Sequence, residues 1–306
     1  MISHRITASA LAICISASAL TAHHFYGPYP VTLKGYDGDK TNSVSYGGQI
    51  ARQAMEQSLK KLASTGNGGG NAAEVEAQMM QYFSGPTKDL AILAPASKDG
   101  FKVKQTTIGE LSSSANLEGK FYKGLMPAWP GNHTGVDVMK DMISRAAKSN
   151  KGFDAENGYD YAQLISKFTM GAVQYSQAVD NYLDEKMTAD IKPNDMPYKE
   201  GKHYTGKEHS WDEGFGYFGA PAHTMALTPA AAYDIAKRKD MASADRNGDG
   251  VVDLKSEMVF GPAYYAAAFD KAGNTNYLAA IMQAYIDGRK VCLLYTSPSP
   301  RDDQTS

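Results

Sequence analysis

The sequence contains little cysteine, no excess of charge of either sign, and no long apolar run outside its first residues. Only two cysteines occur in 306 residues. Lys and Arg number 31 against 33 Asp and Glu, so there is no basic surface of the kind that attracts nucleic acid. Glycine-rich phosphate loops, nucleophile elbows and His-Glu-x-x-His zinc motifs are also absent from the sequence. We therefore expect no nucleic-acid partner, and we favour binding over catalysis.

Residues 1–22 have the pattern of a secretory signal peptide. A short basic start precedes an apolar stretch that is too short to span a bilayer, and small residues follow at Ala17, Ser18 and Ala19. We therefore expect an exported protein, periplasmic or on the cell surface, with no transmembrane segment. Lipid anchoring through Cys14 is an alternative.

The other end of the sequence predicts a tail that is foreign to the protein. Residues 292–302, CLLYTSPSPRD, are similar to the translation of a widely used sequencing adapter. We expect residues 292–306 to be this non-native tail and residues 23–291 to form the domain, as one helical bundle or two packed bundles. Without residues 1–22 and 292–306 the protein would contain no cysteine, which excludes disulfides and thiolate metal sites.

The middle of the chain predicts a mainly α-helical bundle. Apolar residues recur at helical spacing in residues 45–63, 72–83 and 159–187, whereas residues 91–129 predict an irregular insertion or a short β-hairpin. In the third helix we expect one stripe to be core: Leu164, Phe168, Tyr175, Val179 and Tyr182. A second stripe is either solvated or lines a polar groove: Gln163, Lys167, Gln174, Gln177 and Asn181.

The stretch KEHSWDEGFGYFG, residues 207–219, gathers ionisable groups on one predicted helix. On a helical wheel its aromatic residues form one face, and His209 lies with Asp212 and Glu213 on the other. Spacings of three and four residues allow side chains to converge on one cation. We expect a site for iron, another divalent metal or a small ligand, formed by Glu208, His209, Asp212 and Glu213. The alternative is a packing helix whose acids only favour the helix dipole.

Three glycines in the same stretch need an explanation, because each weakens a helix interior by about 1 kcal/mol relative to alanine. Gly214, Gly216 and Gly219 indicate either the close approach of another segment or room for a ligand beside the acids.

Residues 245–257, DRNGDGVVDLKSE, predict a calcium loop of the EF-hand type between helices expected at 228–239 and 257–269. Position 12 of an EF-hand loop, counted here from Asp245, is normally an acid that binds calcium through both carboxylate oxygens. Here it is Ser256, so a wider loop would have to bring Glu257 to the ion. The expected ligands are Asp245, Asn247, Asp249, the Val251 carbonyl, Asp253 and Glu257. An Asp- and Gly-rich turn without an ion is the alternative.

Four segments together resemble the bacterial family called domain of unknown function 4856: SVSYGGQIARQAMEQSLK, QLISKFTMGAVQYSQAVDNYL, YTGKEHSWDEGFGYFGAP and DRNGDGVVDLKSE. The resemblance spans about residues 26–289. It implies an exported, largely helical bacterial protein with no established activity. A weaker resemblance is to imelysin-like exported proteins, which are linked to iron uptake and also classed with peptidases. Their His-x-x-Glu pair corresponds to His209 with Asp212 here.

These observations leave three functions open. The first is an exported helical protein that binds a metal ion or small ligand and carries a structural calcium loop. The second is a calcium-stabilised surface or adhesion module with no second site. The third, and least supported, is an imelysin-like metallohydrolase, which would need an open coordination position for water and a nearby general base.

Overall fold

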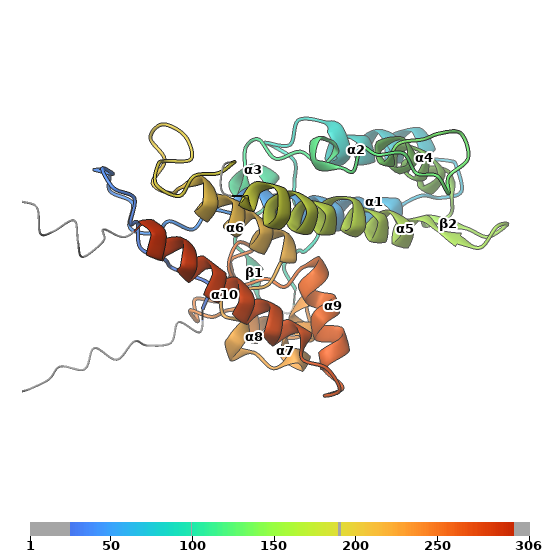
Figure 1. Ribbon diagram of the computed structural model, residues 1–306. Helices are drawn as coiled ribbons and strands as arrows, with labels where there is room; N and C mark the ends of the chain where they lie inside the picture. Colours follow the sequence, from blue (N-terminus) through green and yellow to red (C-terminus); the bar gives the residue numbers. More distant parts are fainter. Residues whose placement is uncertain (1–24, 99, 189–190, 297–306) are drawn as a thin grey trace, which may run out of the picture.

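The computed structural model describes residues 25–98, 100–188 and 191–296 and confirms that the fold is mainly α-helical (Figure 1). The predicted signal peptide, including Cys14, and residues 297–306 of the predicted tail lie outside the described residues. In the part of the chain that is described, no helix is long and apolar enough to cross a membrane.

A first helical group contains α1 (Gly47–Ala63), α2 (Ala72–Ser84), α4 (Gly135–Lys148) and α5 (Tyr161–Thr169). Helix α1 packs against α2 and α5, and α4 packs against α2 and α5 in turn. Met55, Leu59, Met79, Phe83 and Ile143 are fully buried between them. The helices predicted at 45–63 and 72–83 are thus confirmed, and the apolar spacing in each forms this core.

Helix α5 continues without a break into two π-helical stretches, η2 (Met170–Tyr175) and η3 (Gln177–Asp184), and ends in the 3-10 turn η4 (Glu185–Met187). In this part the predicted core stripe is wrong at Tyr175 and Val179, which are 60% and 40% exposed, and confirmed at Tyr182, which is buried. Gln174, from the stripe predicted to be polar, is fully buried. A π-helix has more residues per turn than an α-helix, so side chains rotate away from positions calculated at 100° per residue.

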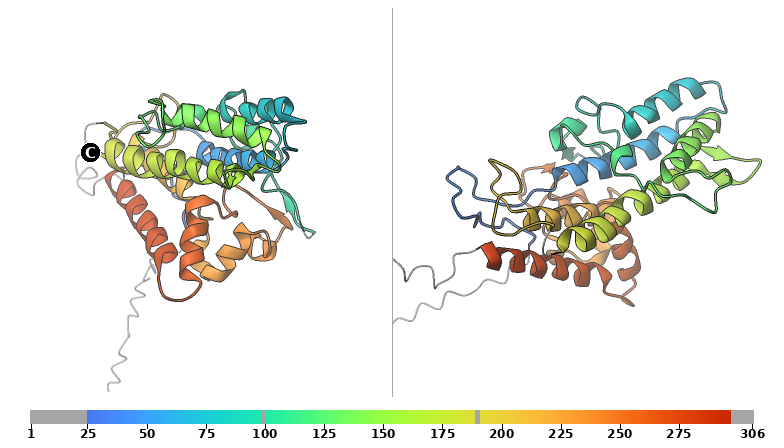
Figure 2. Two further views of the ribbon diagram at one scale, coloured as in Figure 1. Left: turned by 90° about the vertical axis from the view of Figure 1, so that its right-hand side faces the viewer. Right: turned by 45° about the horizontal axis from the view of Figure 1, so that its top comes forward.

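A second helical group contains α7 (Pro229–Ala236), α8 (Met241–Ala244), α9 (Gly261–Asp270) and α10 (Tyr277–Thr296). Helix α6 (Gly206–Phe218) lies between the two groups and contacts α1, η3, α9 and α10 (Figures 1 and 2). The helix predicted at 228–239 ends earlier, at Ala236, and the one predicted at 257–269 begins later, at Gly261. Pro229 and Pro262 each occupy the first turn of their helix, where a proline is tolerated.

Within the described residues, the named strands form two short pairs. β1 (Lys102–Val103) pairs in parallel with β4 (Val251–Val252), so residues 91–129 contact the predicted calcium loop. β2 (Phe153–Asp154) and β3 (Tyr159–Asp160) form a hairpin, which lies outside the segment where a hairpin was expected. Residues 91–129 are otherwise irregular except for α3 (Ile108–Leu111) and η1 (Glu118–Lys120), and a further 3-10 turn, η5 (Thr224–Ala226), follows α6.

Candidate functional site

Local sequence determines both ends of α6. Thr205 caps the first turn by accepting from the Glu208 N–H at 3.2 Å, and the Glu208 carboxylate accepts from the Thr205 N–H at 2.8 Å. This reciprocal capping box satisfies two backbone groups that a helix start otherwise leaves unpaired. Gly219 ends the helix in the left-handed region, with φ of 77°.

The glycines of α6 allow close packing against α1 and α9. A Cβ added to Gly216 would lie 2.7 Å from the Gln49 Cβ and 2.9 Å from the Tyr46 Cβ. One added to Gly219 would lie 2.8 Å from the Phe260 Cβ. Of the two explanations that the sequence allowed, close approach of another segment therefore accounts for these two positions.

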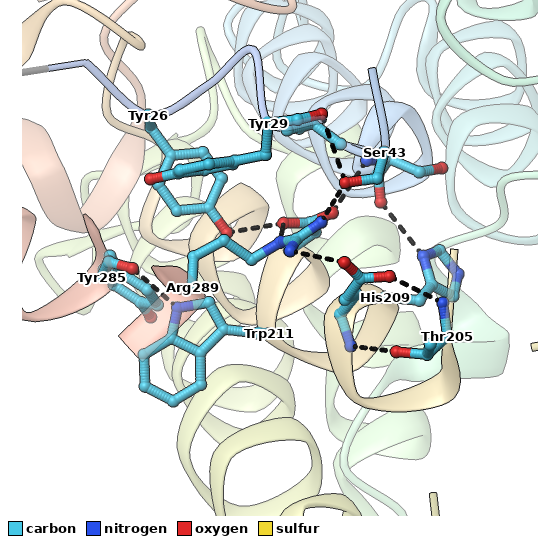
Figure 3. Close-up of polar contacts among 12 residues, drawn as sticks. Tyr26, Tyr29, Ser43, Thr205, His209, Trp211, Tyr285 and Arg289 are labelled. Atoms are coloured by element: carbon cyan, nitrogen blue, oxygen red, sulfur yellow. Dashed lines mark hydrogen bonds and ion pairs between the residues drawn. The ribbon is translucent and has the colours of Figure 1, made fainter. Parts of the chain in front are cut away.

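The acids Glu208 and Asp212 converge on a cation of the protein itself, the guanidinium of Arg289 in α10 (Figure 3). Arg289 donates from Nη1 to Glu208 at 2.9 Å and from Nε to Asp212 at 2.9 Å. All three side chains are at most 1% exposed. A buried pair of this kind stabilises only when each charge is fully hydrogen-bonded.

The chain before α1 completes the bonding of this cluster (Figure 3). Arg289 donates from Nη2 to the Ser43 hydroxyl at 2.7 Å, and its guanidinium lies 5.1 Å from the Tyr29 ring centroid. Tyr26 donates its hydroxyl to Asp212 at 2.7 Å, while its ring stacks on Phe215 at 3.6 Å. The cluster therefore fastens the segment before α1 to both α6 and α10.

The electrostatics of the cluster follow from its burial. Burial alone would lower the pKa of Arg289, but the charges of Asp212 and Glu208 outweigh it and raise that pKa above its usual value. Burial, reinforced by the Asp212 charge, likewise raises the pKa of Tyr26 well above its usual value. The arginine stays charged and the tyrosine stays a hydrogen-bond donor across the physiological pH range.

His209 and Glu213 lie on a different side of α6. His209 Nδ1 lies 3.1 Å from the Ser45 carbonyl oxygen, and its ring packs against Tyr198 and Tyr204, with centroids 4.6 and 4.8 Å away. Burial lowers the pKa of His209, although Glu213 opposes this effect. Its Nε2 is 3.8 Å from Glu213 Oε1.

Glu213 is itself bonded to the protein. Its Oε1 accepts from Gln49 Nε2 at 2.8 Å and from the Tyr182 hydroxyl at 3.1 Å. The four residues predicted as one site thus separate into two pairs. Across residues 25–98, 100–188 and 191–296, no three His, Cys, Asp or Glu side chains form a group that could hold a metal ion. Sequence reasoning missed Arg289, which carries no local signal because Lys290 follows it directly and a basic pair of this kind is usual on an exposed helix surface.

In the predicted calcium loop, acidic and amide side chains accept hydrogen bonds from the loop's own backbone N–H groups. Asp245 accepts from the N–H groups of Gly248, Asp249 and Gly250 at 2.8 to 3.2 Å. Asn247 accepts from the Asp249 N–H at 3.0 Å, and Asp249 accepts from the Val251 N–H at 2.8 Å. These bonds hold three of the predicted ligand side chains over one tight turn.

Glu257, the residue one place later than expected, closes the loop. Its Oε1 accepts from the Arg246 N–H at 3.1 Å and its Oε2 from the Asp253 N–H at 2.7 Å. Asp253 is turned outward, accepting from Lys104 and Gln105 at 2.9 Å each. Although burial opposes it, these two bonds hold the pKa of Asp253 below its usual value.

A family model of a domain of unknown function, DUF4856, matches residues 35–244. The chain belongs to this family. No curated protein and no solved structure matches it. The DUF4856 match contains α6 with all four of its predicted site residues. It ends at Ala244, before the calcium loop and before Arg289, so it is narrower than the span of 26–289 that the resemblance implied.

An apolar cavity of about 730 Å³ lies beside α6. It explains why large apolar side chains of the π-helical segment and of the second helical group are exposed, because they line it: Tyr175, Val179, Phe269, Tyr277 and Ile281. Trp211 of α6 also lines the cavity, and it donates its indole N–H to the Tyr285 carbonyl at 2.8 Å.

Proposed function

We propose that this DUF4856 protein is an exported, calcium-stabilised binding protein in which the loop at residues 245–257 holds one Ca²⁺ ion. The observation that carries the proposal is the position of Glu257. Its two carboxylate oxygens reach back into the loop, where they accept from the backbone N–H groups of Arg246 and Asp253. This bend over the loop supports Glu257 as the bidentate calcium ligand of a loop that is one residue longer than usual.

The ligand chemistry favours calcium over softer metals. The residues available are carboxylates, an amide and a backbone carbonyl, which are the oxygen donors that Ca²⁺ prefers: Asp245, Asn247, Asp249, Val251 and Glu257. The predicted ligand Asp253 is bonded to Lys104 and Gln105 instead, so it would act at most through a water molecule. An ion here would neutralise carboxylates that otherwise repel one another.

The role of calcium would be to clamp elements together. β4 belongs to the loop and pairs with β1, and Leu254 donates its N–H to Gln105 at 2.9 Å. Fixing the loop therefore fixes residues 102–105 against residues 251–254. At the millimolar calcium of extracellular fluids, a site with a dissociation constant of about 0.1 mM would add about 1.4 kcal/mol to the free energy of unfolding.

Calcium titration of the full chain by calorimetry, compared with magnesium, tests the proposal. We expect one calcium site per chain, lost in the double variant Asp245→Ala, Asp249→Ala and kept in the matched control Asp37→Ala, Asp39→Ala. The control removes two acids of the same type from an exposed segment. Equal heats in all three proteins, or no saturable calcium binding by the parent, would overturn it.

The metal or ligand site at Glu208, His209, Asp212 and Glu213 stays a prediction. A cation bound between Glu208 and Asp212 would have to displace Arg289, so the geometry favours the calcium loop as the metal site. Iron binding and imelysin-like hydrolysis have no support from this arrangement.

A further inference from the structure

A second cavity, of about 630 Å³, lies where the two helical groups meet, and it is rich in basic side chains. α1 contributes Lys60 and Lys61, α5 contributes Lys167, and the end of α7 contributes Lys237 and Arg238. Among the described residues that line it, the only acid is Glu56 of α1. We call this cavity the basic cleft.

The five cations of the basic cleft form no ion pair within the described part of the chain, where the ion pairs all lie elsewhere. Lys60 donates to Gln163 at 2.8 Å, Lys61 donates to the Leu93 carbonyl at 3.1 Å, and Lys167 contacts the Tyr265 hydroxyl. Burial, and then the charge of Lys167, lower the pKa of Lys60. Like charges held together in this way are unfavourable unless an anion joins them.

Glu56 lies at the inner wall of the basic cleft and is 4% exposed. Its Oε1 has no hydrogen-bond partner among the described residues. Burial raises its pKa to about 7, against the opposing effects of Ser166, Lys60 and Lys167. A carboxyl group that is protonated near neutral pH can donate a hydrogen bond to an anion, whereas a carboxylate would repel it.

We propose that the basic cleft binds a small polyanion, a molecule with two or more carboxylate, phosphate or sulfate groups. Its anionic oxygens would accept from Lys60, Lys167 and Lys237, and Glu56 would donate from the inner wall. Tyr264 and Tyr265 of α9 line the same cleft, and their ring centroids lie 4.8 and 4.7 Å from the ammonium groups of Lys237 and Lys167, so they position these two lysines. This site is separate from the calcium loop, and the proposal does not depend on calcium binding.

The groups around Glu56 give this binding a defined pH dependence. Those facing it are Lys60 on α1, Ser166 and Lys167 on α5, Lys237 after α7, and Tyr264 and Tyr265 on α9. Among these groups, Glu56 is the one whose pKa burial raises to about 7, into the range between pH 6 and 8. Anion affinity should therefore fall as the pH rises through about 7.

The test is calorimetric titration of the full chain with sulfate and, separately, with succinate, at constant ionic strength. Sulfate represents tetrahedral oxyanions and succinate represents carboxylates. The anion that binds with the higher affinity therefore identifies the kind of group that the cleft prefers. We expect saturable binding of at least one. It should be about tenfold weaker in the variant Lys167→Gln, Lys237→Gln, because two charge-assisted hydrogen bonds are lost. Both lysines are exposed, so this variant should fold.

Two controls make the result decisive. The variant Lys148→Gln, Lys151→Gln removes two exposed lysines that do not line the basic cleft and should bind as the parent does. Glu56→Gln should bind sulfate with the same affinity at pH 6 and pH 8, while the parent weakens several-fold across that range. Absence of saturable binding by the parent, or an equal loss in the Lys148 control, would overturn the proposal. The same pH dependence in Glu56→Gln as in the parent would overturn the role of Glu56.

Discussion

Replacing Arg289 by methionine tests whether the buried cluster on α6 holds the fold together. The change removes the donors at 2.9, 2.9 and 2.7 Å to Glu208, Asp212 and Ser43. Asp212 would keep its bonds from the Tyr26 hydroxyl and the Ser45 N–H, but Glu208 would keep only that from the Thr205 N–H. Two carboxylates would remain buried without a counter-charge, which typically costs about 3–5 kcal/mol.

Urea unfolding followed by circular dichroism measures this loss, and thermal unfolding should show a drop of about 10 °C. The neighbouring variant Lys290→Met is the control, because that ammonium is partly exposed and pairs only loosely with Asp287, at 3.5 Å. The triple variant Arg289→Met, Glu208→Gln, Asp212→Asn should recover about 2 kcal/mol of the loss, because its buried groups are neutral. If Arg289→Met lowers the free energy of unfolding by less than about 1 kcal/mol, the buried cluster on α6 does not hold the fold together.

Two further predictions concern packing and pH. Gly216→Ala should destabilise the protein by about 1–3 kcal/mol, since the new methyl group meets the stems of Gln49 and Tyr46. Gly214→Ala should leave the free energy of unfolding nearly unchanged in the same urea assay, because its new Cβ would lie 3.2 Å from Leu183 Cδ2, the movable end of that side chain. An equal loss of stability in Gly214→Ala and Gly216→Ala would contradict this explanation from packing. Because folding raises the pKa of Glu56 from 4.5 to about 7, the parent should lose stability as the pH rises through that window. Glu56→Gln should therefore be about 3 kcal/mol more stable than the parent at pH 8 and nearly equal to it at pH 4.5, and an equal difference at both pH values would contradict the assigned titration.

The sequence predicts helices well where apolar spacing follows the α-helical period. Residues 45–63 and 72–83 are examples, and Thr228 with Pro229 correctly marks the start of α7. The same period fails in part after Thr169, because π-helical turns rotate Tyr175 outward and Gln174 inward, although Tyr182 is buried as predicted. Tertiary packing determines where such turns form, so no local pattern revealed them.

The candidate sites show the same limit. Helical spacing indicated that side chains on α6 could converge on a cation, and Glu208 and Asp212 do so, but the cation is a guanidinium 77 residues beyond Asp212. Nothing in one sequence specifies a partner at that separation. The basic cleft likewise combines residues from α1, α5 and α7, so it becomes visible only when those helices are placed together.

The metal content of the purified full chain is the most direct test of the calcium proposal. The protein would be equilibrated with calcium, iron, manganese and zinc together, and analysed by plasma mass spectrometry. We expect one calcium ion per chain, absent from the Asp245→Ala, Asp249→Ala variant and present in Arg289→Met wherever that variant is folded. A chain that retains no calcium, or retains it equally in the loop variant, would contradict the account.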